Sequence, residues 1–303
     1  PSRAEELDVE GLEPKALLQW LRRRLPRTTG DGRLHGVLLA YDAGRNLEDI
    51  GASAATDPHV PDVLWAQYDA WVESESADGP YRFVGEPMAV ERLKRWVDAG
   101  CDTPLVHHDV PPLESTMRPE DYKRIIHDVL QRISRGELYQ ANIARRLQCR
   151  LDVSALPGLY WRLRQRNPAQ FGALWAMDEG RWLASNSPEC LFKFDPTTRW
   201  VHSYPIKGTR PRGASEIEDA QHVDALRNDP KERAEHVMIV DLVRNDLGRV
   251  CETGSVGVET LFGVRPFPTL HHMVSDIRGR LSSNADLPEL IGALFPGGSI
   301  TGA

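Results

Sequence analysis

Four short runs with strand character follow one another closely between residues 171 and 204. They cover 171–177, 182–185, 189–194 and 199–204, and turn residues such as Asp178-Glu179-Gly180 separate them. Strands that follow each other across short turns pair in antiparallel fashion. The sequence therefore predicts an antiparallel meander over this stretch.

A lysine follows the last of these strands, in the stretch Tyr204–Gly213. Pro205 and Gly208 interrupt regular strand pairing on either side of Lys207, so we expect a rigid turn to fix this lysine. A lysine held in that way can bind an anion or attack carbon. The alternative is a solvated basic turn, because Arg210 and Arg212 follow closely.

The composition limits the class of protein. A chain of 303 residues with 41% hydrophobic residues can bury a substantial core, as one large domain or two ordinary ones. The formal charge of −7 argues against nucleic acid as the principal partner. No run approaches the roughly 18 apolar residues that span a membrane, and no secretory signal is visible, so we expect a cytoplasmic protein with no membrane partner. Reduced structural thiols are expected of its widely spaced cysteines, Cys101, Cys149, Cys190 and Cys251.

Hydrophobic periodicity divides the chain into an N-terminal portion, 1–118, and a more regular part, 119–303. The best candidate for a linker between them is the proline-rich stretch 102–118. Helices are predicted over 17–25, 63–72, 90–97, 119–133 and 229–248. Further strands are predicted over 35–41, 138–144, 255–262 and 271–277.

Three carboxylates are candidates for chemistry. Glu232 and Glu235 lie one turn apart on the helix predicted from Asp229, and such a pair can share a hard cation such as magnesium. Glu232 is also the third helical residue after an acidic N-cap, so a capping role is the alternative for it. Glu189 opens a strand after Pro188 and is either a surface residue or an acid that faces the same site as Lys207.

Polar groups in three further stretches are candidates for binding. Gln140 and Asn142 fall on the same side of the strand predicted over 138–144, where they would line a polar pocket or lie solvated at an edge. His271 and His272 should point to opposite faces of their strand, which makes them an unnatural metal pair. The glycine-rich stretch 297–302 could bring backbone N–H groups to an anion, although it matches neither the Walker A nor the dinucleotide pattern.

Six motifs occur in an order that resembles the chorismate-utilising enzymes, most specifically component I of aminodeoxychorismate synthase. The resemblance is strong from about Pro119 onward and weak over the first hundred residues. The motifs are Gly136–Asn142, Ser187–Glu189, Pro205–Thr209, Glu232–Gly248, His271–Ser275 and Phe295–Ala303.

The resemblance implies a fold of the α/β (α+β) class. Two large antiparallel sheets would pack as a sandwich with helices outside, in a single chorismate-binding domain over 1–303 whose catalytic core is 119–303. The active site would lie between the sheets. By the same resemblance, we expect further residues after Ala303, among them a second pair of metal-binding acids.

The resemblance also implies a reaction. Lys207 would attack C2 of chorismate, and ammonia would then add at C4 to give 4-amino-4-deoxychorismate for 4-aminobenzoate and folate synthesis. Glu189 would act as general acid and base, and Glu232 and Glu235 would hold Mg²⁺. The implied substrate-binding residues are Gln140, Gly208, Thr209, His272, Gly298, Ser299 and Thr301.

Two residues separate this branch from its relatives, and ammonia implies a partner. Anthranilate-forming relatives have alanine where Lys207 stands, and isochorismate and salicylate synthases have a water-activating lysine where Gln140 stands. A separate glutamine amidotransferase subunit would supply ammonia in a heterodimer. The alternatives are anthranilate synthase component I, which Lys207 argues against, and a non-catalytic protein that binds a small carboxylate.

Overall fold

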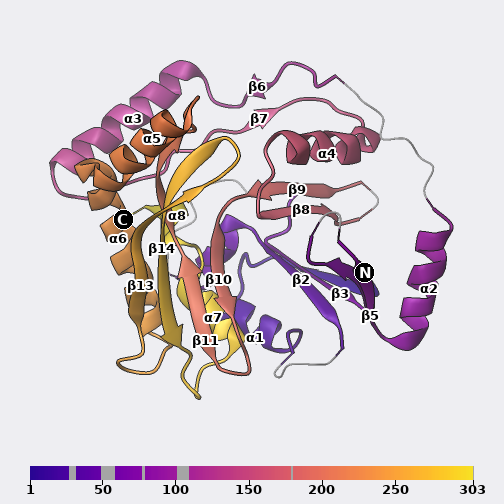
Figure 1. The fold of residues 1–303 in the computed structure, drawn as a ribbon. Coiled ribbons are helices and arrows are strands. Elements are labelled where there is room, and N and C mark those ends of the chain that lie inside the picture. The colour runs from indigo at the N-terminus through magenta and orange to yellow at the C-terminus, as the bar shows by residue number, and fades with distance from the viewer. Residues whose placement is uncertain (27–31, 49–58, 77–78, 101–108, 179, 303) are drawn as a thin grey trace. The chain divides into compact units, whose positions relative to one another are not determined.

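A computed structural model describes residues 1–26, 32–48, 59–76, 79–100, 109–178 and 180–302 (Figure 1). The chain divides into two compact units. The first comprises Pro1–Pro104 and Asp286–Phe295, and the second comprises Leu105–Ala285 and Pro296–Ala303. Each unit has its own core, and a single domain over 1–303 stays a prediction. Of the predicted linker 102–118, residues 102–108 lie outside the described residues.

The first unit is built on a three-stranded antiparallel sheet in the order β1-β3-β2. The sheet consists of β1 (Arg3–Leu7), β2 (Leu34–Leu39) and β3 (Val63–Tyr68). The other elements are α1 (Ala16–Arg22), η1 (Tyr41–Asn46), the hairpin β4 (Ala70–Ser74) with β5 (Tyr81–Gly85), α2 (Pro87–Asp98) and α7 (Leu287–Leu294). Arg22 of α1 joins α7 through ion pairs with Asp286 at 2.6 Å and Glu289 at 2.7 Å. The helices predicted over 17–25 and 90–97 and the strand over 35–41 are confirmed.

The helix predicted over 63–72 is wrong, because this stretch forms β3 and the start of β4. Val63, Leu64, Trp65 and Ala66 are all at most 2% exposed, since β3 is the central strand between β1 and β2. A strand buried on both faces is apolar throughout, and such a run cannot be distinguished from a buried helix by periodicity alone.

The second unit is built on a five-stranded sheet around the long strand β14 (Leu270–Arg280). β13 (Gly257–Pro266) pairs with one edge of β14, whereas β11 (Trp200–Tyr204) and β12 (Ile206–Pro211) share the other, with β10 (Cys190–Phe194) beyond β11. The other strands form two pairs, β6 (Glu114–Ser115) with β7 (Leu147–Gln148) and β8 (Phe171–Ala176) with β9 (Trp182–Ser187). The helices are α3 (Pro119–Ser134), η2 (Val153–Ala155), α4 (Leu156–Arg166), α5 (Glu216–Asn228), α6 (Pro230–Gly248) and α8 (Gly298–Thr301).

β11 and β12 form one line along β14, with Pro205 between them. Ser275 N donates to Pro205 O at 3.3 Å, so the pairing continues through the proline. The register then shifts by one residue between Lys207 and Thr209, which marks a β-bulge at Gly208. The prediction that Lys207 lies in a turn is therefore wrong. It lies within β12, next to the bulge, because pairing with β14 overrides the local turn signals.

Helices α5 and α6 cover one face of the central sheet (Figure 1). On β14, Met273, Ser275 and Ile277 are fully buried on that face. α6 begins as predicted, since the Asp229 side chain accepts hydrogen bonds from Lys231 N and Glu232 N, and Pro230 is the first helical residue. The amphipathic helix predicted over 119–133 is confirmed as α3.

The strand predicted over 138–144 is wrong. Only Ala141 makes a strand-like pairing there, an isolated bridge to Gly302. An alternating pattern fits any extended segment, and whether such a segment becomes a strand depends on a neighbouring strand that the pattern does not report.

The mixed α/β class with antiparallel sheets and helices is confirmed. In the part of the chain that the structure describes, no helix is long and apolar enough to cross a membrane. Cys149, Cys190 and Cys251 are free thiols, as predicted, and Cys101 lies outside the described residues.

Candidate active site

Lys207 points to the same side of the sheet as α6. Its partner across the strands is Met273, which is fully buried on the helix-covered face, and directly opposed residues of an antiparallel pair share a face. The Lys207 amine donates a hydrogen bond to the backbone carbonyl of Ser299 in α8 at 3.2 Å. Two predicted site residues are therefore in direct contact.

The bulge at Gly208 brings β12 close to α6. Gly208 has φ +78°, which favours glycine, and a Cβ there would lie 3.0 Å from Leu226 Cδ1 and 3.2 Å from Glu232 Oε2. A side chain at this position would push against the carboxylate of Glu232. Glycine thus allows a candidate metal ligand to lie beside the strand that carries Lys207.

Glu189 lies beside the same strand. Its Oε1 accepts a hydrogen bond from Ile206 N at 3.2 Å, and its own N–H donates to Ser187 Oγ at 3.2 Å. Ile206 directly precedes Lys207, so the carboxylate is anchored one residue from the lysine. Glu189 therefore contacts the backbone beside Lys207, and whether its carboxylate faces the same site as Lys207 stays a prediction.

The two histidines lie on opposite faces of β14, as predicted. His272 Nδ1 and Thr209 Oγ1 are 3.0 Å apart, whereas His271 is buried on the helix side with its Nε2 2.8 Å from Asp219 Oδ1. Burial lowers the pKa of His272, and the Gly208 carbonyl and the Glu189 charge oppose that effect. His272 and Thr209 therefore belong to the surroundings of the bulge, and His271 does not.

Both arginines after Lys207 are paired, which contradicts the alternative of a solvated basic turn. Arg210 binds Asp229 at 2.7 Å, and Arg212 binds Asp219 at 2.8 Å. Asp219 also accepts from Gly213 N at 2.8 Å. Its pKa is held well below the usual range, first by Arg212 and then by Gly213 N and His271. These contacts fix the far end of β12 to α5 and α6.

Glu232 and Glu235 lie one turn apart on α6, and Glu232 lies beside the bulge. Glu232 Oε1 lies 3.6 Å from Arg210 Nη1, and Glu235 Oε1 lies 3.4 Å from Lys231 Nζ. Within the described ranges, no group of three or more His, Cys, Asp or Glu side chains could hold a metal. Two carboxylates nevertheless fit Mg²⁺, which commonly takes one or two protein carboxylates and completes its octahedral shell with water and substrate oxygens.

The glycine-rich stretch 297–302 forms the short helix α8 beside Lys207. Gly298 packs against Leu242 of α6, where a Cβ would overlap the leucine side chain. Thr301 Oγ1 donates to Gly302 O at 3.2 Å. The backbone carbonyl of Gln140 lies against Gly302. The buried side-chain Oε1 of Gln140 has no hydrogen-bond partner among the residues described.

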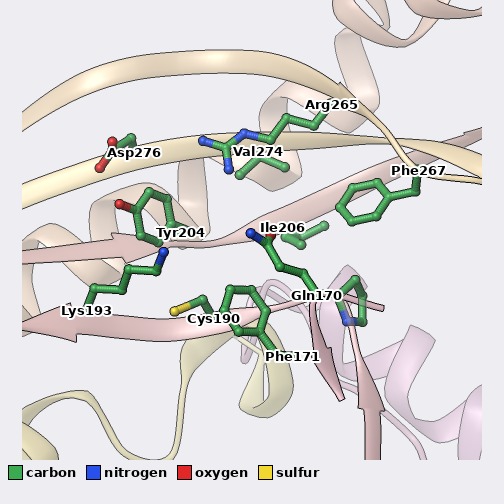
Figure 2. A pocket seen from close by; sticks show the side chains of 11 residues that line it. Gln170, Phe171, Cys190, Lys193, Tyr204, Ile206, Arg265, Phe267, Val274 and Asp276 are labelled. Atoms are coloured by element: carbon green, nitrogen blue, oxygen red, sulfur yellow. The ribbon is translucent and has the colours of Figure 1, made fainter. Parts of the chain in front are cut away.

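A pocket of about 160 Å³ adjoins Glu189. Pro188 and Cys190, on either side of Glu189, belong to its lining. Figure 2 shows Lys193 of β10 and Arg265 of β13 approaching Tyr204, with the charged atoms 5.9 Å and 5.5 Å from the ring centroid. The lining consists of Gln170, Phe171, Pro188, Cys190, Lys193, Tyr204, Ile206, Arg265, Phe267, Val274 and Asp276.

Sequence reasoning missed these pocket cations and a buried pair, His236 and Ser275. Lys193 and Arg265 come together only through the pairing of their strands with β11 and β14, which no local pattern reports.

His236 Nε2 lies 2.6 Å from Ser275 Oγ, which also accepts from Phe262 N at 3.2 Å. Burial, with a smaller effect of the Lys207 charge, lowers the pKa of His236 to about 4. A histidine within the apolar part of α6 was the available signal.

Comparison with known proteins places the chain in a family. The model of the chorismate binding enzyme family matches residues 4–303. Aminodeoxychorismate synthase component 1 of Klebsiella aerogenes is 37% identical over 274 residues, which cover 88% of this chain and 58% of that protein. Anthranilate synthase component 1 1 of Haloarcula marismortui is 36% identical over 288 residues, with the same coverage of 88% and 58%.

The solved structures agree at the level of the fold. Anthranilate synthase component I from Streptococcus pneumoniae TIGR4 superposes with a TM-score of 0.79 at 23% identity, covering 94% of this chain and 67% of that one. The chain spans 58% of the length of each of the two curated relatives named above. The family match over nearly the whole chain and the relatives above 30% identity lead to one conclusion: the chain belongs to the chorismate binding enzyme family.

Proposed function

We propose that this chain carries the chorismate-converting site of an aminodeoxychorismate synthase, with Lys207 as the nucleophile. The observation that carries the proposal is the position of Lys207. Its amine donates a hydrogen bond to the Ser299 carbonyl at 3.2 Å. The Glu189 carboxylate accepts a hydrogen bond from the N–H of Ile206, the residue that precedes Lys207. A nucleophile and an acid–base group are thereby brought to one strand.

The proposed reaction has two displacements. The neutral amine of Lys207 forms a bond to C2 of chorismate, the ring double bonds shift, and the C4 hydroxyl leaves with a proton from Glu189 as water. Ammonia then forms a bond to C4, the double bonds shift back, and the C2–N bond breaks. The Lys207 nitrogen keeps both of its protons in the C2-bound intermediate, as a secondary ammonium, and therefore leaves as the neutral amine. Glu189 accepts the proton that the nitrogen on C4 loses. The net change is chorismate plus ammonia to 4-amino-4-deoxychorismate plus water.

Glu232 and Glu235 are proposed to hold Mg²⁺. The absence of a Cβ at Gly208 leaves the Glu232 carboxylate beside β12, and both glutamates lie on the same side of α6. An ion held there would neutralise a carboxylate of the substrate. The chain's own residues act on the ring, with Lys207 on carbon and Glu189 on the leaving oxygen.

Gln140 supports ammonia rather than water as the second nucleophile. Its amide is uncharged and cannot take a proton from water, unlike the lysine expected at this place in isochorismate and salicylate synthases. Ammonia is proposed to come from a glutamine amidotransferase subunit. The name component 1, carried by the Klebsiella aerogenes relative, is consistent with a second component.

Identification of the product tests the proposal. The full-length protein is given chorismate, Mg²⁺ and ammonium at mildly alkaline pH, and the products are separated by chromatography. We expect 4-amino-4-deoxychorismate. Anthranilate would favour the function of the Haloarcula marismortui relative. Isochorismate would contradict the inference from Gln140, and chorismate binding without turnover would favour a binding protein.

Glu235→Gln is expected to weaken magnesium binding by about tenfold or more, since one anionic ligand is lost while the size of the side chain is kept. The measurement is the Mg²⁺ dependence of the initial rate together with binding of Mn²⁺, followed by electron paramagnetic resonance in the absence of substrate. Glu216→Gln, at an exposed glutamate in the first turn of α5, is the matched control. Equal Mn²⁺ affinity in both variants would exclude Glu235 as a ligand.

A further inference from the structure

The last carbonyls of α8 lack partners within the helix, because α8 ends at Thr301. The side chain of Asn142 supplies a hydrogen-bond donor to two of these carbonyls. Its Nδ2 donates to Ser299 O at 3.0 Å and to Ile300 O at 2.8 Å. A single amide group thus binds two consecutive carbonyls of the helix.

One of these carbonyls is the one that holds Lys207. Ser299 O accepts from Asn142 Nδ2 and from Lys207 Nζ, at 3.0 Å and 3.2 Å. A carbonyl oxygen has two lone pairs and can accept both bonds. Asn142, Ser299 and Lys207 therefore form a continuous series of hydrogen bonds from the surface to the amine.

Among the described residues, other contacts hold α8 in place without a hydrogen bond to this carbonyl. Gly298 packs closely on Leu242, and Gly302 bridges to Ala141, where a Cβ would overlap the Gln140 carbonyl. These contacts fix both ends of the short helix. The Asn142 amide acts between them, on the carbonyl that faces Lys207.

We propose that Asn142 is a positioning residue for Lys207 and acts through the Ser299 carbonyl. The inference rests on the proposed role of Lys207 as nucleophile. A lysine side chain has a long flexible stem, and an amine can attack carbon only with its lone pair aimed at that carbon. A hydrogen bond from the amine to a fixed carbonyl removes part of this freedom. Asn142 keeps the carbonyl fixed.

Asn142→Ala in the full-length protein removes both hydrogen bonds to α8. It is expected to lower kcat by about three- to tenfold, the effect of losing the one bond that orients the Ser299 carbonyl, with KM little changed. Reaction of Lys207 with a small acylating reagent in the absence of chorismate is expected to become faster than in the wild type, because the amine is freed from the carbonyl. The rate of labelling is measured by peptide mass spectrometry relative to the exposed Lys123. Asn142→Gln keeps an amide donor and should lie closer to the wild type in both measurements.

Asn228→Ala is the matched control, since it removes an amide that donates to the Asp224 carbonyl at 2.9 Å on α5. It should change neither the labelling of Lys207 nor kcat. An unchanged ratio of Lys207 to Lys123 labelling in Asn142→Ala would overturn the inference, and so would an unchanged kcat. If Lys207→Ala retains product formation, the proposed function fails, while the labelling ratio still decides whether Asn142 holds the amine.

Discussion

Lys207→Ala is expected to lower the rate of 4-amino-4-deoxychorismate formation by at least about 1000-fold, because it removes the atom that forms the covalent bond to C2. Binding of chorismate should change far less than the rate. The amine makes one hydrogen bond to the Ser299 carbonyl, and the other proposed contacts to substrate come from different residues. The measurement is kcat by product chromatography, with the affinity for chorismate measured separately by equilibrium binding.

Lys123→Ala is the control for this variant. Lys123 lies exposed on α3, in the same unit as Lys207, and the same side chain is removed without touching β12. It should retain the wild-type rate. If Lys207→Ala were to retain more than about a tenth of the wild-type rate, the lysine could not be the nucleophile. Lys207 would then no longer argue against the function of the anthranilate-forming relatives.

Acid is expected to destabilise the protein through His236. In the folded chain its pKa is about 4, against an ordinary value of 6.5, because burial and then the Lys207 charge oppose protonation. Below about pH 6.5 the unfolded chain binds a proton at this residue that the folded chain binds only near pH 4. The free energy of unfolding therefore falls as pH falls through this window. The loss from His236 is about 3 kcal/mol, at 1.36 kcal/mol for each pKa unit.

The acid effect can be assigned by comparing variants. Urea unfolding at pH 7 and pH 4.5, with a chelator present, gives the change in the free energy of unfolding for each protein. His236→Gln keeps a hydrogen-bonding group near Ser275 but does not titrate, so it should lose clearly less stability than the wild type between the two pH values. His222→Gln, at a partly exposed histidine of α5, should behave like the wild type. Equal losses in His236→Gln and wild type would show that another group causes the acid effect.

Two of the predictions that rested on local patterns are confirmed, at the start of α6 and at His271 and His272. The start of α6 follows from an acidic N-cap, Asp229, and a proline at the first helical position. The Asp229 side chain accepts from Lys231 N and Glu232 N within the first turn. The opposite orientations of His271 and His272 follow from the two-residue period of a regular strand. Both features were readable from a few consecutive residues.

Predictions that depended on a distant partner failed or were incomplete. Lys207 was expected in a turn, yet the register of β12 on β14 extends the sheet through Pro205 to the bulge. The pairing of His236 with Ser275 joins residues 39 positions apart, and Arg265 reaches the pocket only because β13 pairs with β14. Tertiary pairing decides these contacts, and one sequence does not report it.

The most direct test of the central claim is peptide mass spectrometry of the full-length protein after a brief reaction with chorismate and Mg²⁺ in the absence of ammonium. If Lys207 attacks C2, the intermediate accumulates because the second displacement lacks its nucleophile. The proposed function predicts an adduct on the peptide that contains Lys207, with the added mass of chorismate less one water. This adduct should disappear on addition of ammonium. Product formation on ammonium addition without any adduct on Lys207 at any time would contradict the proposed function.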